Sequence, residues 1–171
     1  AIAKVIKNRN AAISVVGIPK TVDNDIPYVY QTFGYATALE IAQEALRSAH
    51  TEAKSVVNVI GLVRVMGRHA GFIAAGASLA STDTHFVLVP EVRFALDGTQ
   101  GLLNALEKRL STHKHAVIAV AEGAGQDLFG NHTQTRDESG NLKAQDIGTL
   151  LRERITTHFE TRNIPVVMKY I

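Results

Sequence analysis

Two acids and a hydroxyl lie close together in a loop near the start of the chain, with Thr21, Asp23 and Asp25 inside the segment 17–26. Carboxylates two positions apart point to the same side of an extended segment. One of them can then accept a proton while the other holds a divalent cation. The same residues also suit a plain turn, because Asp and Asn side chains hydrogen-bond their own backbone. A calcium-binding loop is excluded, since the glycine and distal glutamate of that motif are not at their spacing.

The segments on either side of this loop indicate its place in a fold. Residues 11–16 are apolar and predict a short buried strand that leads into the loop, and residues 32–48 have the periodicity of a helix. Gly17 and Pro19 interrupt the pattern between them. A strand, a sharp turn and a helix in succession place the loop where open α/β sheets bind their ligands.

The rest of the chain alternates between strand and helix patterns. Residues 1–10 resemble the end of a helix, and residues 72–80 are apolar nearly all round, which predicts a buried helix. The alternation predicts an α/β fold with a mostly parallel sheet, flanking helices and right-handed crossovers. The further strands are expected at 55–65, 85–89, 116–121 and 164–168, the further helices at 102–110 and from a cap at Asp146 to Phe159, and an exposed turn at 137–141.

Composition restricts the class of protein. The chain has 171 residues, 46% hydrophobic and 20% charged, which fits one globular α/β unit over residues 1–171. A net charge of +2 gives no electrostatic reason to expect nucleic acid or a membrane surface as a partner. The absence of cysteine excludes disulfides and thiolate metal sites. No apolar run approaches the roughly 20 residues of a membrane span and no signal peptide opens the chain, so a cytoplasmic protein is expected.

Three segments together resemble one enzyme family. Gly-Ile-Pro-Lys-Thr-Val-Asp-Asn-Asp-Ile at 17–26, Met-Gly-Arg-His-Ala-Gly at 66–71 and Ala-Glu-Gly at 121–123 are similar, in this order, to three motifs of the phosphofructokinases. The resemblance covers essentially the whole chain. It implies a Rossmann-like phosphofructokinase fold and the glycolytic transfer of a phosphoryl group from ATP to the 1-hydroxyl of fructose 6-phosphate. It also implies Mg2+ as the cofactor and a homo-oligomer.

The same resemblance implies roles for single residues. Asp23 is expected to be the base that removes the proton of the 1-hydroxyl, and Arg68 to approach the reacting groups with its planar fork of donors. Asp25 is expected near the magnesium ion, which neutralises charge on the phosphoryl oxygens. Without the motifs, core packing is the favoured interpretation of Met66, and a solvent-exposed loop carboxylate is the usual interpretation of Glu122. The expected substrate-binding residues are Thr21, Val22, Asp23, Asp25, Met66, Gly67, Arg68 and Glu122.

Lys20 is the position that bears on the phosphoryl donor. Many bacterial ATP-dependent members have glycine there, whereas lysine is similar to pyrophosphate-dependent enzymes and to the plant- and trypanosome-type ATP-dependent group. The sequences at 61–63 and 121–128 are more similar to the plant- and trypanosome-type ATP-dependent group, whereas the sequence at 69–71 is similar to pyrophosphate users. ATP and pyrophosphate therefore both remain as donors, with ATP preferred.

Several family features are missing from this sequence. The glycine-rich donor loop that opens family members and the later region that grips the sugar 6-phosphate have no counterpart in it. The chain thus resembles the central portion of the enzyme, and the alternative is a non-catalytic fragment or a module that binds sugar phosphate. On its own, the segment is expected to lack turnover. The seven histidines include no pair at metal-ligand spacing on one predicted helix, and His113, His115 and His132 are expected at the surface.

Overall fold

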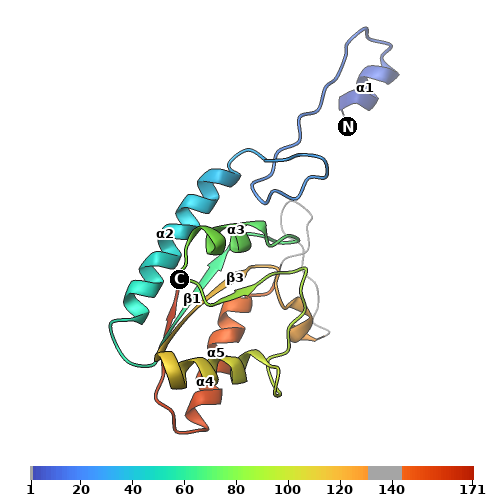
Figure 1. Ribbon diagram of the computed structural model, residues 1–171. Helices are drawn as coiled ribbons and strands as arrows, with labels where there is room; N and C mark the ends of the chain where they lie inside the picture. Colours follow the sequence, from blue (N-terminus) through green and yellow to red (C-terminus); the bar gives the residue numbers. More distant parts are fainter. Residues whose placement is uncertain (1, 131–143) are drawn as a thin grey trace.

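A computed structural model describes residues 2–130 and 144–171, which form a four-stranded sheet with helices on both faces (Figure 1). The strands lie in the order β2-β3-β1-β4, and all three pairs are parallel, as the α/β alternation predicted. The strands are β1 (Val59–Val65), β2 (Phe86–Leu88), β3 (His115–Ala121) and β4 (Val167–Tyr170). The helices are α1 (Ile2–Asn8), α2 (Tyr35–Ala53), α3 (Phe72–Ala80), α4 (Leu102–His113), α5 (Ile147–Glu160) and the short 3-10 helix η1 (Gln126–Phe129).

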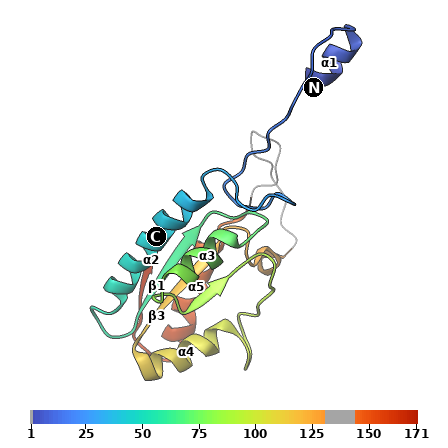
Figure 2. The ribbon, with the colours of Figure 1, turned by 45° about the horizontal axis from the view of Figure 1, so that its top comes forward.

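Alternate residues of the central strands pack into two separate cores. Ile60 and Leu62 of β1 belong to the core formed with α4 and α5, whereas Val59 and Val63 belong to the one formed with α2 and α3. A central parallel strand is thus buried on both sides, which explains why β1 and β3 are apolar almost throughout. The sheet is the middle of three layers, and its two faces are covered by different helix pairs (Figures 1 and 2).

The ends of the helices follow from single residues. The side chain of Asp146 accepts hydrogen bonds from the backbone N–H groups of Gly148 and Thr149, which confirms it as the cap of α5. Gly34, with a φ of 85°, precedes α2 in a conformation that suits a residue without a side chain. These two residues mark where α2 and α5 begin.

The predicted strand at 11–16 is wrong. Residues 11–20 are exposed and form no strand, and together with α1 they run away from the sheet as an arm (Figures 1 and 2). A strand forms only where its N–H and C=O groups find a partner strand, and the four strands of the described sheet pair with one another. Ile2 and Val5 of α1 are exposed as well.

Several other predictions need correction. Strand β1 begins four residues later than predicted, and α2 begins three and ends five residues later than predicted. Helix α3 has the predicted bounds but is not buried all round, because Ile73, Ala74 and Ala77 face the core while Leu79 is 87% exposed. Strand β4 begins three residues later than expected, after Pro165, which has no N–H to donate to a neighbouring strand. The turn predicted at 137–141 and His132 lie outside the described residues.

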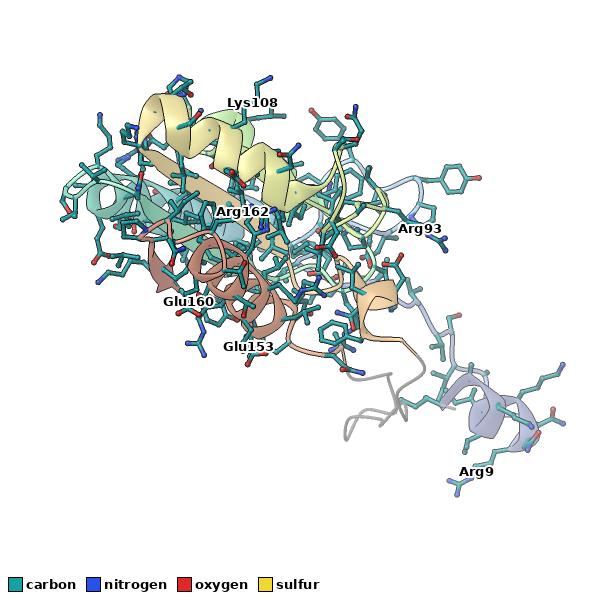
Figure 3. The ribbon with its side chains drawn as sticks, turned by 90° about the horizontal axis from the view of Figure 1, so that it is seen from below. Arg9, Arg93, Lys108, Glu153, Glu160 and Arg162 are labelled. Carbon is teal, nitrogen blue, oxygen red and sulfur yellow. The ribbon has the colours of Figure 1, made fainter. Side chains whose placement is uncertain are left out.

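Charged side chains mark the outer surfaces of the helical layers. Figure 3 shows Lys108 on α4, Glu153 and Glu160 on α5 and Arg162 just beyond it, and all four are exposed. The same figure shows Arg9 at the far end of the N-terminal arm. Among the described helices, none has both the length and the apolar composition needed to cross a membrane.

Candidate functional site

The candidate site lies where the chain leaves two adjacent parallel strands toward opposite faces of the sheet. Strands β1 and β3 are neighbours, but the chain leaves β1 for α3 on one face of the sheet and leaves β3 for η1 and α5 on the other. In open parallel sheets such a point forms a crevice at the carboxyl ends of the strands, and ligands bind there. The 66–71 and 121–123 motifs are the two loops that flank this crevice.

Backbone contacts lock these two loops together. Glu122 donates its N–H to the Val65 carbonyl and Gly123 donates its N–H to the Gly67 carbonyl, each at 3.0 Å. A Cβ at Gly123 would lie only 1.8 Å from the Arg68 carbonyl oxygen, so a residue with a side chain cannot occupy this position as it stands. Arg68 and Glu122 thereby project side by side, with Arg68 Nε 3.9 Å from Glu122 Oε1.

A pocket of 370 Å³ joins these loops to the 17–26 segment. Glu122 and Asp23 are half-buried, so neither is a solvated loop carboxylate. Met66 is 50% exposed and lines the pocket, which rules out the core-packing alternative for it. The lining residues are Lys20, Thr21, Val22, Asp23, Met66, Arg68, His69 and Glu122. Six of these eight belong to the predicted substrate-binding set, and a seventh, Lys20, was predicted to bear on the phosphoryl donor. They come from three motifs far apart in the chain.

The segment that carries Asp23 is held in shape by its own polar groups. The Asp23 N–H donates to Thr21 Oγ1 at 3.1 Å, and Asn24 adopts a left-handed φ of 58°. Asn24 Oδ1 accepts from the Thr32 N–H at 2.9 Å, and Asn24 Nδ2 donates to the Tyr30 carbonyl at 3.5 Å. Asn24 thus stabilises the turn, while Asp23 lines the pocket.

Two predicted residues do not line the pocket. The chain bends at Val22 and Asp23, so the extended geometry that would place both aspartates on one side is absent, and Asp25 is exposed outside the lining set. Gly67 is buried, and a Cβ there would come within 2.3 Å of the Ala70 carbonyl oxygen. With a φ of 132° it shapes the loop that carries Met66 and Arg68.

Two contributors to the site were missed from the sequence. His69 lines the pocket next to Arg68, and its position inside the 66–71 motif was the signal available for it. Glu91 is further away in the sequence, and its two carboxylate oxygens accept from the Gly71 N–H at 2.8 and 3.1 Å. A carboxylate suits the N-terminal end of a helix, so Glu91 fixes the point where the loop enters α3.

The pocket combines groups of opposite charge within a small volume. Asp23 and Glu122 supply carboxylates, Lys20 and Arg68 supply cations, and Thr21 adds a hydroxyl. A carboxylate can accept the proton of a substrate hydroxyl, and a guanidinium can bind phosphoryl oxygens through two parallel hydrogen bonds. The arrangement is therefore suited to an anionic, hydroxyl-bearing ligand.

Sequence comparison identifies proteins similar to this chain. The family profile described as phosphofructokinase matches residues 1–167. The ATP-dependent 6-phosphofructokinase of Borreliella burgdorferi is 49% identical over 99% of the chain, which corresponds to 39% of that relative. ATP-dependent 6-phosphofructokinase 1 of Arabidopsis thaliana is 47% identical over 100% of the chain and 37% of the relative. The chain thus spans less than half the length of the curated relatives it matches.

Structural comparison points to the same fold. A pyrophosphate-dependent phosphofructokinase from Marinobacter aquaeolei superposes with a TM-score of 0.67 at 22% identity, covering 99% of this chain and 39% of that one. A phosphofructokinase from Saccharomyces cerevisiae gives a TM-score of 0.63 at 20% identity over 99% of this chain and 22% of that one. With the profile match over nearly the whole sequence, these likenesses lead to one assignment: the chain belongs to the phosphofructokinase family.

Proposed function

We propose that the protein carrying this chain transfers a phosphoryl group from ATP to the 1-hydroxyl of fructose 6-phosphate, as a glycolytic 6-phosphofructokinase. The observation that carries the proposal is the pocket itself, which gathers Asp23, Arg68 and Glu122 from three separate motifs at the switch point of the sheet. The names of the relatives at 44–49% identity support the same reaction.

In the proposed reaction Asp23 removes the proton of the sugar's 1-hydroxyl. Its carboxylate suits this step because the hydroxyl oxygen becomes an effective nucleophile only as its proton leaves. Arg68 binds the oxygens of the transferring group, and its position is set by the backbone contact with Gly123 and by the neighbouring Glu122. Thr21 binds the phosphoryl group and Glu122 a sugar hydroxyl, while Val22, Met66 and Gly67 shape the sugar site. Together these residues hold attacker and phosphoryl group in line.

Magnesium is the proposed cofactor, and Asp25 is the residue proposed to hold it. Magnesium in phosphoryl-transfer sites binds one or two carboxylates together with substrate phosphate oxygens. Asp25 fits this requirement because it is an exposed carboxylate two residues after Asp23 in the same segment. When bound, the ion neutralises the charge of the phosphoryl oxygens.

The decisive experiment replaces Asp23 by Ser in the protein at its natural length. Loss of a general base should lower kcat by ~10²–10⁴ with a smaller effect on sugar-phosphate affinity. Asp97→Ser is the matched control, because Asp97 is an exposed partner of Arg154 on the far side of the sheet from α2 and α3. A near-normal kcat in Asp23→Ser would contradict the role of Asp23, whereas binding of fructose 6-phosphate without turnover by the unaltered protein would favour a binding function.

Pyrophosphate is the competing donor, because Lys20 and His69 line the same pocket as Asp23. The sequence around His69 resembles pyrophosphate users, and Lys20 resembles both these enzymes and the plant- and trypanosome-type ATP-dependent group, whereas curated relatives at 46–49% identity are named ATP-dependent. We therefore propose ATP. Turnover measured with each donor at equal magnesium concentration distinguishes the two, and strict dependence on pyrophosphate would contradict the proposal.

We further propose that the protein acts in the cytoplasm as a homo-oligomer, with no nucleic-acid or membrane partner. Compartment needs its own test, because two of the Arabidopsis thaliana relatives are named chloroplastic. Cell fractionation followed by light scattering of the native protein checks both points. A protein recovered from an organelle, or one that is monomeric at its natural length, would contradict them.

A further inference from the structure

Three histidines from separate elements meet at the amino edge of the sheet, at the opposite ends of the strands from the candidate pocket. His50 lies in the last turn of α2, His85 directly precedes β2, and His115 is the first residue of β3. One ring nitrogen from each lies within 4.8 Å of the other two, and the ring centroids are 5.3–5.6 Å apart. All three residues are half-buried, so the cluster is partly accessible to solvent.

Two of these rings are oriented from behind by hydrogen-bond acceptors. His50 Nδ1 lies 2.6 Å from an oxygen of the Asp83 carboxylate, and His115 Nδ1 lies 2.9 Å from the His113 carbonyl oxygen. Both rings therefore carry their proton on Nδ1 and keep the lone pair of Nε2 free of that proton. A carboxylate or carbonyl behind Nδ1 is the arrangement that fixes the tautomer of metal-binding histidines.

The third ring is in the other tautomer. The N–H of Val117 donates to His85 Nδ1 at 2.8 Å, so the His85 proton lies on Nε2. To bind a metal through Nε2, His85 must move its proton to Nδ1 and give up the bond with Val117. This exchange makes His85 the weakest of the three ligands, and affinity should be lower than in a site with three preset rings.

Charged side chains surround the cluster and affect its affinity for a cation. Asp83 adds one negative charge, whereas Arg109 and Lys54 oppose a dication and limit its affinity.

We propose that His50, His85 and His115 bind a zinc-class divalent transition-metal ion, with Asp83 and the His113 carbonyl as the groups that orient the ligands. Imidazole nitrogens are ligands that such ions prefer, and three of them leave a fourth position for water. Nitrogens 2.0–2.1 Å from a tetrahedral ion lie about 3.3 Å apart, so side-chain rotation must bring the ring nitrogens closer together than the 4.8 Å within which they lie here. The bound ion would tie the end of α2 to the starts of β2 and β3.

The test is a titration of the protein at its natural length with Zn2+, in excess Mg2+ so that any magnesium site is filled. One ion per chain is expected. The double variant His50→Gln/His115→Gln should weaken binding at least about 100-fold, and His85→Gln about tenfold. Asp83→Asn keeps the shape of the carboxylate but should weaken binding by about 10–100-fold, the range for residues that orient metal ligands.

His113→Gln is the matched control, because the hydrogen bond between His113 and His115 uses the backbone carbonyl of His113, which the substitution leaves in place, and the metal affinity of this variant should equal that of the unaltered protein. Thermal melts of the metal-free variants check that each one folds. If a variant does not fold, the absorption spectrum of Co2+ bound to the unaltered protein gives the answer, since a tetrahedral nitrogen site absorbs strongly and an octahedral aqueous ion weakly. Absence of saturable binding, equal affinity in the double variant, or a weak octahedral spectrum would each overturn the proposal.

Discussion

Gly123 is the position at which one methyl group tests the geometry of the candidate pocket. A Cβ built there lies 1.8 Å from the carbonyl oxygen of Arg68 and 2.6 Å from its carbonyl carbon. Real Cβ contacts essentially never fall below 3.0 Å, so Gly123→Ala must displace one of the two backbones by at least about 1.2 Å. The displacement cannot be absorbed by a flexible side chain, because both atoms that clash belong to the main chain.

The displacement should harm activity more than stability. Overpacking of this kind typically lowers the free energy of unfolding by about 1–3 kcal/mol. A shift of about 1 Å in a group that positions substrate can cost about 10²-fold in rate, and the clash moves Arg68 relative to Glu122. We therefore expect kcat/KM for the proposed kinase reaction to fall by about 100-fold or more in the fraction that remains folded.

Gly61→Ala provides the contrast. A Cβ at Gly61 would lie 3.2 Å from the Cβ of Ala49 and 3.3 Å from its carbonyl oxygen, between β1 and α2 and away from the pocket. This variant should lose stability but keep its kcat/KM. Urea denaturation and steady-state kinetics on both variants check the expectation. The reasoning would be refuted if Gly123→Ala kept normal kinetics, or if its activity fell only as far as its folded fraction did.

Three further predictions concern stability, pH and association. Asp146→Ala removes the cap of α5 and the acceptor of the Tyr170 hydroxyl, so urea denaturation should show a loss of about 1–2 kcal/mol, and no loss would contradict the capping role. Burial opposes ionisation of Asp146, but hydrogen bonds from Tyr170 and Thr149 and the Arg64 charge outweigh it and lower its pKa below 3.8. The stabilisation by the ionised Asp146 is therefore present above about pH 4 and is lost as the pH falls through the folded pKa. As the pH is lowered, the free energies of unfolding of Asp146→Ala and of the unaltered protein should converge. A difference between them that does not change with pH would contradict this expectation. Light scattering of the 171-residue chain should show dimers or larger species that Leu79→Lys reduces, because Leu79 on α3 is 87% exposed, whereas a monomeric unaltered chain would contradict the expectation.

The fold could largely be predicted because its signals are local. β-branched runs gave the strands, apolar periodicity gave the helices, and the side chain of Asp146 gave the start of α5 within one residue. The failures lie where the outcome depends on distant partners. Residues 11–16 are as apolar as a buried strand, but pairing requires a neighbour that local sequence does not reveal. The prediction that α3 is buried all round failed for the same reason, because the composition of a helix does not show which of its faces other elements cover.

The candidate site could be predicted only in part. The motifs gave the residues, and the rule that ligands bind at the carboxyl edge of a parallel sheet gave their place. The orientation of Asp25 was not predictable from an assumed extended segment, because Asn24 takes a left-handed conformation and turns the chain. Glu91 was not predictable as a partner of the Gly71 N–H, since the two residues meet only after β2 has paired with β3.

The histidine cluster shows how the same topological rule applies at the other edge of the sheet. A search for metal ligands along single helices could not find it, because its members come from a helix end and two strand starts. His85 and His115 both fall at the amino ends of parallel strands, so pairing of β2 with β3 necessarily places them at one edge. His50 joins them because α2 ends where β1 begins, beside the same edge. The carboxyl edge therefore gathers residues from three loops that line a pocket, while the amino edge gathers three rings from one helix end and two strand starts, which favours binding of a small ion over binding of a substrate.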